Sequence, residues 1–362
     1  MFLIDLIAGA RPNFMKIAPI ISSIKKYKSK KIKYRLIHTG QHYDKNMSQS
    51  FFNQLGIPEP DFNLESGGGT QAEITSKIMV RYESLLVTSP SDLCLVVGDV
   101  TSTMACSIVA KKQKIKVAHV EAGIRSWDLT MPEEINRMVT DSITDYFFTT
   151  SKYANSNLLN LGVPNNKIFF VGNTMIDSLL KNINKLRKPY FWNDQNLINK
   201  KYIVMTLHRP SNVDNKNNLQ KLIHSICESI NDFKLLFPVH PRTKNILKNL
   251  KINDENLVLI DPLPYLEFNY LIKNSLCVIT DSGGITEETT VLGIPCITIR
   301  ENTERPETIE IGTNELIGTN LNSIKKSLKK IFSKRWKKGS IPPLWDGKAS
   351  DRIVKYLIKI FE

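Results

Sequence analysis

The feature that most constrains the fold of this chain is a repeated alternation of short apolar runs with longer amphipathic stretches. Apolar runs of about four to eight residues are typical of buried strands, and longer stretches with helical apolar spacing are typical of amphipathic helices. Strands that alternate with helices build parallel, doubly wound sheets. The pattern therefore predicts an α/β protein.

The alternation starts twice along the 362 residues, which predicts two Rossmann-like doubly wound domains facing a central cleft. The expected strands are Phe2–Ala8, Arg35–Thr39, Leu93–Gly98, Val117–Val120, Tyr146–Thr149 and Ile168–Val171 in the first half, and Tyr202–Leu207, Lys234–Val239, Leu257–Ile260, Cys277–Thr280 and Cys296–Ile299 in the second. A polar segment, Lys181–Lys201, lies between them. We place the N-terminal domain at residues 1–172 and the C-terminal domain at 173–348. A C-terminal helix expected at 349–362 either closes the second domain or crosses back onto the first.

The net charge of +14 comes largely from two lysine clusters, Lys25–Lys33 and Lys325–Lys338. A basic protein is able to bind nucleic acid, anionic membranes or anionic small molecules. In the second cluster, Ile324, Leu328 and Ile331 follow helical spacing, which puts the lysines on a solvated face. No signature of a nucleic-acid-binding fold accompanies the charge, so we expect no nucleic-acid partner.

The apolar runs and the cysteines indicate a cytoplasmic protein. No run approaches the roughly 18–20 residues that cross a bilayer, so no membrane partner is expected. The N-terminal run meets Asp5 and Arg11 too soon for a signal peptide. The five cysteines have no paired spacing, which predicts neither disulfides nor a zinc site.

Reactive side chains gather at the predicted carboxyl ends of the strands, where open α/β sheets bind ligands. These ends carry Arg11, His38–His42, Asp99 and His119–Gly123 in the first half, and His208, Arg209, His240–Arg242 and Asp281–Gly284 in the second. Loops are polar in general, so a single such residue would mean little. Seven ends with this character predict that the residues line the cleft between the domains.

The strongest local motif is Thr280–Glu288, in which a buried strand leads through Ser282, Gly283 and Gly284 into a helix. Free amides at a helix start favour phosphate, and glycine allows its close approach. Glu288 lies one turn further on, within reach of sugar hydroxyls beside that phosphate. The alternative is an ordinary turn in which the serine caps the helix. Neither a Walker A loop nor a GxGxxG motif is present, so we expect no ATP, NAD or other cofactor.

Three carboxylates are candidates for acid–base chemistry, which needs such groups on both faces of a sugar ring. Asp99 follows a strand end, but it is also placed to cap a helix that begins near Ser102. Glu133 is equally well placed to complete a capping box with Thr130. Glu121 has no simple structural explanation, because it opens a glycine-containing loop directly from a buried strand.

Basic side chains near these motifs are able to neutralise a diphosphate, for which the arginine fork is well suited. The candidates are Arg11, Lys16, Arg125, Arg137, Arg209, Arg242 and Arg305. The segment Ser66–Thr70, with three glycines, is either a lid or a plain surface loop. The residues alone thus predict a phosphate site in the second domain and acid–base groups in the first.

The ordered motifs also identify a resemblance to a known family. They read AGARPNFMK, HTGQHYD, VVGDVTST, HVEAGIRSWDLTMPEEINR, GNTMID, TLHRPSNVD, PVHPRT, TDSGGITEE and ERPET. From near residue 3 to near residue 320, the chain resembles the non-hydrolysing UDP-N-acetylglucosamine 2-epimerases.

The resemblance implies the two-domain, glycosyltransferase-B-like fold and the interconversion of UDP-N-acetylglucosamine and UDP-N-acetylmannosamine. In that reaction UDP leaves as the C2 proton is removed, and it then returns to a bound 2-acetamidoglucal. The resemblance also implies a UDP-sugar as the substrate, a homodimer, and a place in polysaccharide biosynthesis.

The resemblance assigns roles residue by residue. It makes Asp99, Glu121, Glu133 and His208 the catalytic groups, and Arg11, Lys16, Arg125, Phe268, Ser282, Gly283, Gly284 and Glu288 the substrate-binding groups, which Arg305 joins as a diphosphate candidate. His208 would face the departing oxygen, Glu288 the ribose and Phe268 the uracil. Which carboxylate is the acid and which the base stays open.

Two departures from the family pattern bear on the substrate. Ser211 stands where an acidic residue is common, and Asn13 stands where a glutamate is common. The change at Ser211 points either to an altered network around His208 or to a different sugar. Four alternatives stay open: a 2-epimerase for UDP-2,3-diacetamido-2,3-dideoxyglucuronate, whose added carboxylate would suit a strongly basic cleft, a hydrolysing epimerase, a glycosyltransferase of the same fold, and a basic binding protein without activity.

Overall fold

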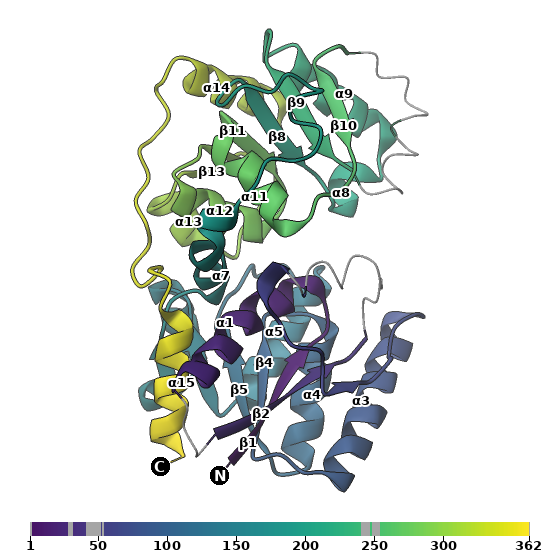
Figure 1. Cartoon of the computed structure of the whole chain (residues 1–362), viewed down its shortest axis with the longest axis vertical. Coiled ribbons are helices and arrows are strands. Elements are labelled where there is room, and N and C mark those ends of the chain that lie inside the picture. The colour runs from purple at the N-terminus through teal and green to yellow at the C-terminus, as the bar shows by residue number, and fades with distance from the viewer. Residues whose placement is uncertain are drawn as a thin grey trace. The chain divides into compact units, whose positions relative to one another are not determined.

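The structure is a computed structural model that describes residues 2–27, 32–40, 52, 54–239, 247 and 254–361. It divides into two compact units (Figure 1). The first comprises Met1–Lys181 and Pro343–Glu362, and the second comprises Asn182–Pro342. The chain thus leaves the first unit once and returns to it.

The first unit is a parallel sheet of seven strands in the order β3-β2-β1-β4-β5-β6-β7. Its elements are β1 (Phe2–Ala8), α1 (Arg11–Tyr27), β2 (Ile32–His38), β3 (Phe62–Asn63), α3 (Gln71–Thr88), β4 (Leu93–Val97), α4 (Thr101–Lys112), β5 (Lys116–Val120), α5 (Pro132–Ile143), β6 (Tyr146–Thr149), α6 (Lys152–Asn160), β7 (Ile168–Phe170), α7 (Thr174–Asn182) and α15 (Ala349–Ile360). Every residue of β4 is buried, as expected for a central strand that is covered on both faces.

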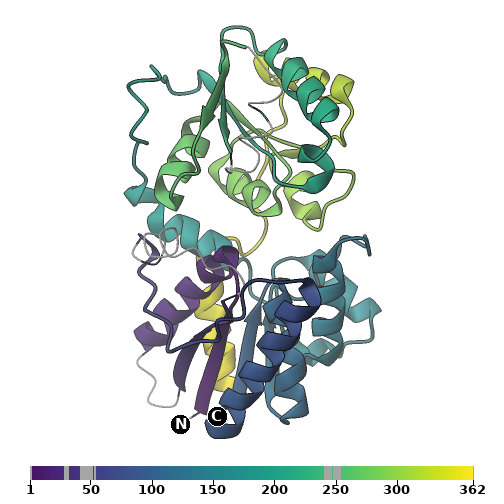
Figure 2. The same ribbon diagram turned by 90° about the vertical axis from the view of Figure 1, so that its right-hand side faces the viewer.

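The C-terminal helix α15 packs beside α1 in the first unit (Figures 1 and 2). Phe361, just after α15, stacks on Phe2 of β1 with ring centroids 4.2 Å apart. At the other end of the helix, the buried carboxylate of Asp177 on α7 accepts the amides of Ala349 and Ser350 at 3.1 and 2.7 Å. These contacts explain why residues 343–362 belong to the first unit.

The division between the units falls after Lys181, whereas the sequence placed it after residue 172. Helix α7 accounts for the difference, because it packs against α1. The Ser178 hydroxyl donates to the carbonyl of Met15, and the Lys181 ammonium lies 2.7 Å from the Ser22 hydroxyl. Side-chain bonds between distant segments of this kind leave no trace in a local pattern.

The second unit has a parallel sheet of six strands in the order β10-β9-β8-β11-β12-β13. Its elements are β8 (Tyr202–Thr206), α8 (Pro210–Val213), α9 (Lys216–Cys227), β9 (Lys234–Pro238), β10 (Leu257–Ile260), α11 (Tyr265–Asn274), β11 (Cys277–Thr280), α12 (Gly283–Leu292), β12 (Cys296–Thr298), α13 (Pro306–Glu310), β13 (Asn314–Leu316) and α14 (Leu321–Phe332). Residues of α9 and α14 share one apolar cluster with the sheet, and residues of α11 share another. The sheet is therefore covered on both faces.

The expected α/β class and the parallel sheets are confirmed, and each expected strand is present. The structure adds the short strands β3 and β13, which were not expected because they hold few apolar residues. On α14, Ile324, Leu328 and Ile331 are buried while the lysines are exposed, as their spacing predicted. Within the described residues, no helix combines the length and the apolar character needed to cross a membrane.

Candidate functional site

In both units the strand order reverses at one point, and the candidate residues flank it. The reversal lies between β1 and β4 in the first unit and between β8 and β11 in the second. Doubly wound sheets bind ligands outside the carboxyl ends of their strands at such a switch point. The residues that follow these strands are Gly9 and Ala10, Gly98 and Asp99, Leu207 and His208, and Asp281 and Ser282. Each unit thus presents its predicted groups at its own switch point.

A buried ion pair joins Lys16 of α1 to Glu121, the residue that follows β5. Their side chains are only 9% and 4% exposed. Gly98 makes room for this pair, because a Cβ built there would lie 2.9 Å from the Lys16 ammonium and 3.2 Å from the Glu121 carboxylate. Its φ of +66° also favours glycine. Two predicted site residues that are far apart in the chain are therefore brought together.

Asn13 fixes the backbone on both sides of the switch point in the first unit. Its amide oxygen accepts the N–H groups of Gly9 and Ala10 at 3.1 and 2.9 Å, and its amide nitrogen donates to the carbonyl of Val97 at 2.9 Å. An ionised glutamate has no donor for that carbonyl. The departure from the family pattern at this position thus has a structural consequence.

The carboxylate of Asp99 is held by a salt bridge to Arg137 of α5. Arg137 also pairs with the buried Glu134 at 2.6 Å, so its guanidinium is fixed from two sides. Helix α4 begins after Val100, which makes no side-chain cap of its own. Arg137 therefore orients Asp99, a role that the sequence did not single out.

Glu133 is an exposed residue in the first turn of α5. The N-cap residue of α5 is Met131, and no side chain caps this helix start. The Thr130 hydroxyl instead donates to the carboxylate of Asp128 at 2.6 Å. The capping-box explanation of Glu133 is therefore wrong.

A buried charge network lies behind Glu121. His119 is fully buried, with Nδ1 2.7 Å from the Asp141 carboxylate and Nε2 2.8 Å from the carbonyl oxygen of Gly98. Burial raises the pKa of Asp141, but the charges and hydrogen bonds of His119 and Arg125 outweigh burial and bring the pKa below its usual value. The His119 ring therefore bridges the Asp141 carboxylate and the carbonyl of Gly98, next to the loop that holds Asp99.

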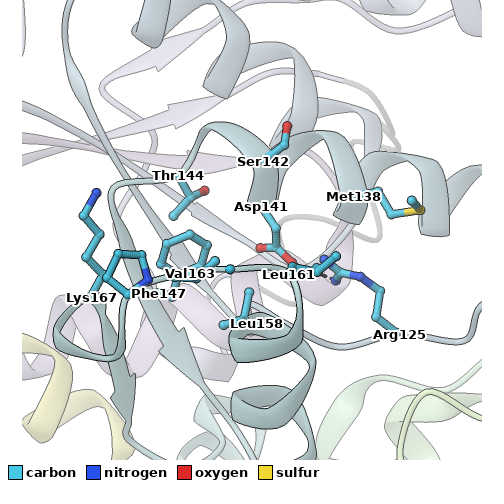
Figure 3. Close-up of a pocket in the computed structure, with 12 residues that line it drawn as sticks. Arg125, Met138, Asp141, Ser142, Thr144, Phe147, Leu158, Leu161, Val163 and Lys167 are labelled. Carbon is cyan, nitrogen blue, oxygen red and sulfur yellow. Dashed lines mark ion pairs between the residues drawn. The ribbon is translucent and has the colours of Figure 1, made fainter.

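Arg125 was expected to contact the substrate, and the structure engages it in this network. Its Nη1 lies 2.7 Å from the Asp141 carboxylate. Arg125 and Asp141 also line a cavity of about 470 Å³ between α5 and α6, together with Met138, Leu158 and Lys167 (Figure 3). Nε and Nη2 of Arg125 have no hydrogen-bond partner within the part of the chain that the structure describes.

In the second unit, His208 is oriented by Asp281. Its Nδ1 lies 2.7 Å from the carboxylate of Asp281, which is fully buried, while the His208 side chain is 64% exposed. The same carboxylate accepts the Arg209 amide at 3.0 Å and the Asn212 side-chain amide at 2.9 Å. Burial raises the pKa of Asp281, but these hydrogen bonds and the charge of His208 bring it below its usual value. An imidazole held at one nitrogen and exposed to solvent is suited to proton transfer.

The start of α12 has the features of an anion site. Ser282 is its N-cap residue but makes no side-chain cap hydrogen bond, so the alternative of a capping serine is wrong. Glycine at position 283 leaves room for the Glu304 carboxylate, because a Cβ there would lie 2.7 Å from one of its oxygens. Amides at a helix start that no side chain caps favour a bound anion.

Glu288 is buried on α12 and faces α11, where Phe268 also lies. The Asn269 side-chain amide approaches the Glu288 carboxylate at 3.4 Å. Burial raises the pKa of Tyr265 far above its usual value, and the neighbouring Glu288 carboxylate raises it further. The structure thus brings Glu288 and Phe268 to adjacent helices.

The remaining candidate residues differ in burial and in whether the structure describes them. Arg305 is buried and pairs with Glu287 of α12. Arg11 is half-buried at the first position of α1. The candidates Gln41, His42, His240 and Arg242 and the side chain of Ser211 lie outside the described residues. Where the structure describes the chain, no group of three or more His, Cys, Asp or Glu side chains is arranged to hold a metal ion.

Comparisons with known proteins place this geometry in a family. The family model described as UDP-N-acetylglucosamine 2-epimerase matches residues 25–358. The UDP-N-acetylglucosamine 2-epimerase of Methanocaldococcus jannaschii is 42% identical over 98% of both chains. The UDP-2,3-diacetamido-2,3-dideoxy-D-glucuronate 2-epimerase of Pseudomonas aeruginosa is 37% identical over 98% of this chain and 99% of its own.

Two solved structures of similar proteins match almost the whole chain. The M. jannaschii UDP-GlcNAc 2-epimerase in complex with UDP-GlcNAc and UDP matches with a TM-score of 0.88 at 41% identity, over 99% of each chain. The S. aureus MnaA–UDP co-structure matches with a TM-score of 0.89 at 31% identity, over 99% of this chain and 98% of that one. The chain therefore belongs to the UDP-N-acetylglucosamine 2-epimerase family, whose members are isomerases.

Proposed function

We propose that the protein interconverts UDP-N-acetylglucosamine and UDP-N-acetylmannosamine by elimination and re-addition of UDP. The observation that carries the proposal is the buried Lys16–Glu121 pair at the switch point of the first unit, in a chain of this family. A carboxylate fixed at a sheet edge by a buried ammonium is in place to exchange a proton with a ligand bound there.

The reaction needs two proton transfers and one leaving group. A carboxylate removes the proton from C2, the bond from C1 to the UDP oxygen breaks, and the electron pair forms the C1–C2 double bond of 2-acetamidoglucal. UDP then re-forms the bond to C1 while an acid returns a proton to the other face of C2. Glu121, Asp99 and Glu133 are the proposed proton-transfer groups, and Arg137 fixes Asp99 for this task.

The second unit supplies the proposed UDP site. The amides of Gly283 and Gly284 face the phosphates, because the Ser282 side chain does not cap this helix start. The Ser282 amide donates to the Thr280 hydroxyl at 3.0 Å, so the Ser282 hydroxyl is the group assigned to the phosphates. Glu288 and Phe268, on the neighbouring helices α12 and α11, are assigned to the ribose and the uracil. The remaining groups are the exposed His208, assigned to the departing oxygen, and Arg11, Lys16, Arg125 and Arg305, assigned to the sugar and the phosphates.

Incubation with UDP-N-acetylglucosamine in deuterated water tests the proposal. We expect deuterium at C2 and a mixture of the gluco and manno UDP-sugars, read by NMR and chromatography. Glu121→Gln should abolish the exchange, whereas Glu83→Gln, at an exposed position of α3, should leave it unchanged. Free N-acetylmannosamine as the product would identify a hydrolysing epimerase. The proposal would be contradicted if C2 took up no deuterium when the reaction starts from UDP-N-acetylglucosamine or from UDP-N-acetylmannosamine.

The similarity to the P. aeruginosa enzyme favours one second candidate substrate, UDP-2,3-diacetamido-2,3-dideoxyglucuronate. The net charge of +14 suits a substrate with an additional carboxylate. The same exchange experiment with this sugar separates the candidates, because the true substrate has the larger kcat/KM.

A homodimer and a cytoplasmic location form part of the proposal. Helices α3, α4 and α5 lie side by side, and Val80, Val87, Ile135 and Met138 expose between 39% and 68% of their surface on α3 and α5. Exposed apolar side chains on such a layer of helices make it the candidate surface for a protein interface. Sedimentation should give twice the monomer mass, and Val87→Lys should lower it. All five cysteines are buried free thiols, which suits a reducing compartment.

A further inference from the structure

Arg300 lies beside the start of α12 and was not among the residues expected at the site. It follows β12 at the carboxyl end of that strand, and it is only 4% exposed. The Glu304 carboxylate holds its Nη2 at 2.7 Å, and the side-chain oxygen of Asn302 accepts from the same nitrogen at 3.2 Å. The guanidinium therefore has a fixed direction.

The direction is toward the first turn of α12. A Cβ built on Gly283 would lie 2.7 Å from an oxygen of Glu304 and 3.9 Å from Nη1 of Arg300. The Arg300–Glu304 pair thus packs directly against the helix start that no side chain caps. A larger residue than glycine at position 283 would displace the pair.

The guanidinium also has hydrogen-bonding capacity that the protein does not use. Nε of Arg300 is buried, and it has no hydrogen-bond partner among the residues that the structure describes. Buried donors are almost always paired, because an unmet one is costly. Glu304 and Asn302 both bind Nη2, so Nε and Nη1 are the nitrogens left for an additional acceptor.

A phosphate group has the chemistry that this arrangement matches. Its oxygens accept from the arginine fork, and its negative charge is favoured at a helix start. Arg305, in contrast, has its Nε engaged by Glu287 of α12. We propose that Arg300 is a diphosphate-binding residue of the second unit and that Glu304 is the positioning residue that aims its guanidinium at the ligand. This inference rests on the proposed function, which supplies the diphosphate.

Calorimetric titration with UDP and with uridine, the same nucleoside without phosphates, tests the inference. Arg300→Lys keeps the charge but loses the fork, so the Kd for UDP should rise by about 10- to 100-fold while that for uridine stays unchanged. Glu304→Gln should give a smaller rise, again for UDP alone. Arg335→Lys, at an exposed position after α14, is the matched control and should bind both ligands as the wild type does.

The outcomes separate the inference from the proposed function. A wild-type protein that binds no UDP contradicts the proposed function. A wild type that binds UDP while Arg300→Lys binds it equally well overturns the inference alone. UDP affinity that is unchanged or higher in Glu304→Gln removes the positioning role of Glu304.

A measurement on the wild type keeps the test valid if a variant does not fold. The Nε–H signal of Arg300 is followed by NMR and assigned through triple-resonance experiments on isotope-labelled protein. This signal should shift when UDP or pyrophosphate is added, but not when uridine is added. A signal that moves equally with uridine, or that does not move with UDP, overturns the inference.

Discussion

Asp141→Asn is the substitution whose effect on stability follows most directly from the structure. The Asp141 carboxylate contacts both His119 and Arg125, and the three side chains are at most 2% exposed. Asparagine has nearly the same shape but no charge, so the buried Arg125 guanidinium loses its counter-charge and His119 loses its carboxylate partner. Removing one partner of a buried ion pair costs about 3–5 kcal/mol in the free energy of unfolding.

That cost translates into a measurable change in melting temperature. For a unit of this size, each kcal/mol shifts Tm by about 2–4 °C, so we expect a fall of about 6–20 °C. Urea and thermal unfolding followed by circular dichroism measure both quantities. Asp346→Asn is the control, because its partner Arg352 and Asp346 itself are 25% and 43% exposed, and such pairs contribute at most about 1 kcal/mol.

The pH dependence of the difference has a defined sign. The pKa of Asp141 is lowered in the folded protein, so its stabilisation is present above the usual carboxyl value of 3.8 and is lost as the pH falls through the lower folded value. The gap between wild type and variant should therefore persist at pH 5 and close only below 3.8. A loss of stability no larger than that of the control would refute the buried charge network.

Three further predictions concern other parts of the structure. Gly98→Ala should slow deuterium exchange at C2 by more than about tenfold, because its methyl group would lie 2.9 Å from the Lys16 ammonium of the proposed site. Gly162→Ala is the control for backbone strain alone, because Gly162 has a φ of +81° and a Cβ there would meet no atom within 4 Å. Equal exchange rates for the two variants would contradict the idea that the methyl group crowds Lys16. Burial lowers the pKa of His38 from 6.5 to about 4, so the unfolded chain takes up a proton that the folded protein does not, and stability should fall as the pH drops from 6.5 to about 4. His38→Gln should flatten that slope in urea titrations, and an unchanged slope would show that another group causes it. Asp281→Asn weakens the hydrogen bond that orients His208, so kcat for the UDP-sugar should fall by at least about tenfold while uridine binding is retained, and an unchanged kcat would remove the orienting role.

The strands and their ends were predictable because the signals are local. A continuous apolar run such as Leu93–Val97 predicts a central parallel strand from five residues alone, and the structure buries all five. The residue after such a strand lies at the ligand-binding edge whatever the rest of the chain does. Asp99, Glu121, His208 and Ser282 were placed at such edges for this reason. The family resemblance then added roles that spacing alone does not supply.

Which side chains meet was decided by the tertiary structure. Lys16 and Glu121 are 105 positions apart, and His208 and Asp281 are 73 apart, yet each pair is in direct contact. The capping-box explanation of Glu133 rested on three-residue spacing, and the actual start of α5 does not use it.

The borders of the units and the partners of the buried arginines were likewise not predictable from local sequence patterns. The return of α15 to the first unit depends on contacts such as those of Asp177 with residues 349 and 350. Arg300 and Arg305 look alike in the sequence, but the structure pairs Arg300 with Glu304 beside the start of α12 and Arg305 with Glu287 on α12 itself. The sequence by itself determined the apolar strands, their order of appearance and the residues at their ends, because hydrophobic periodicity acts over a few positions; the short strands β3 and β13 escaped it. The partners and charges of those residues follow from burial and from contacts between distant segments, which exist only once the chain has folded.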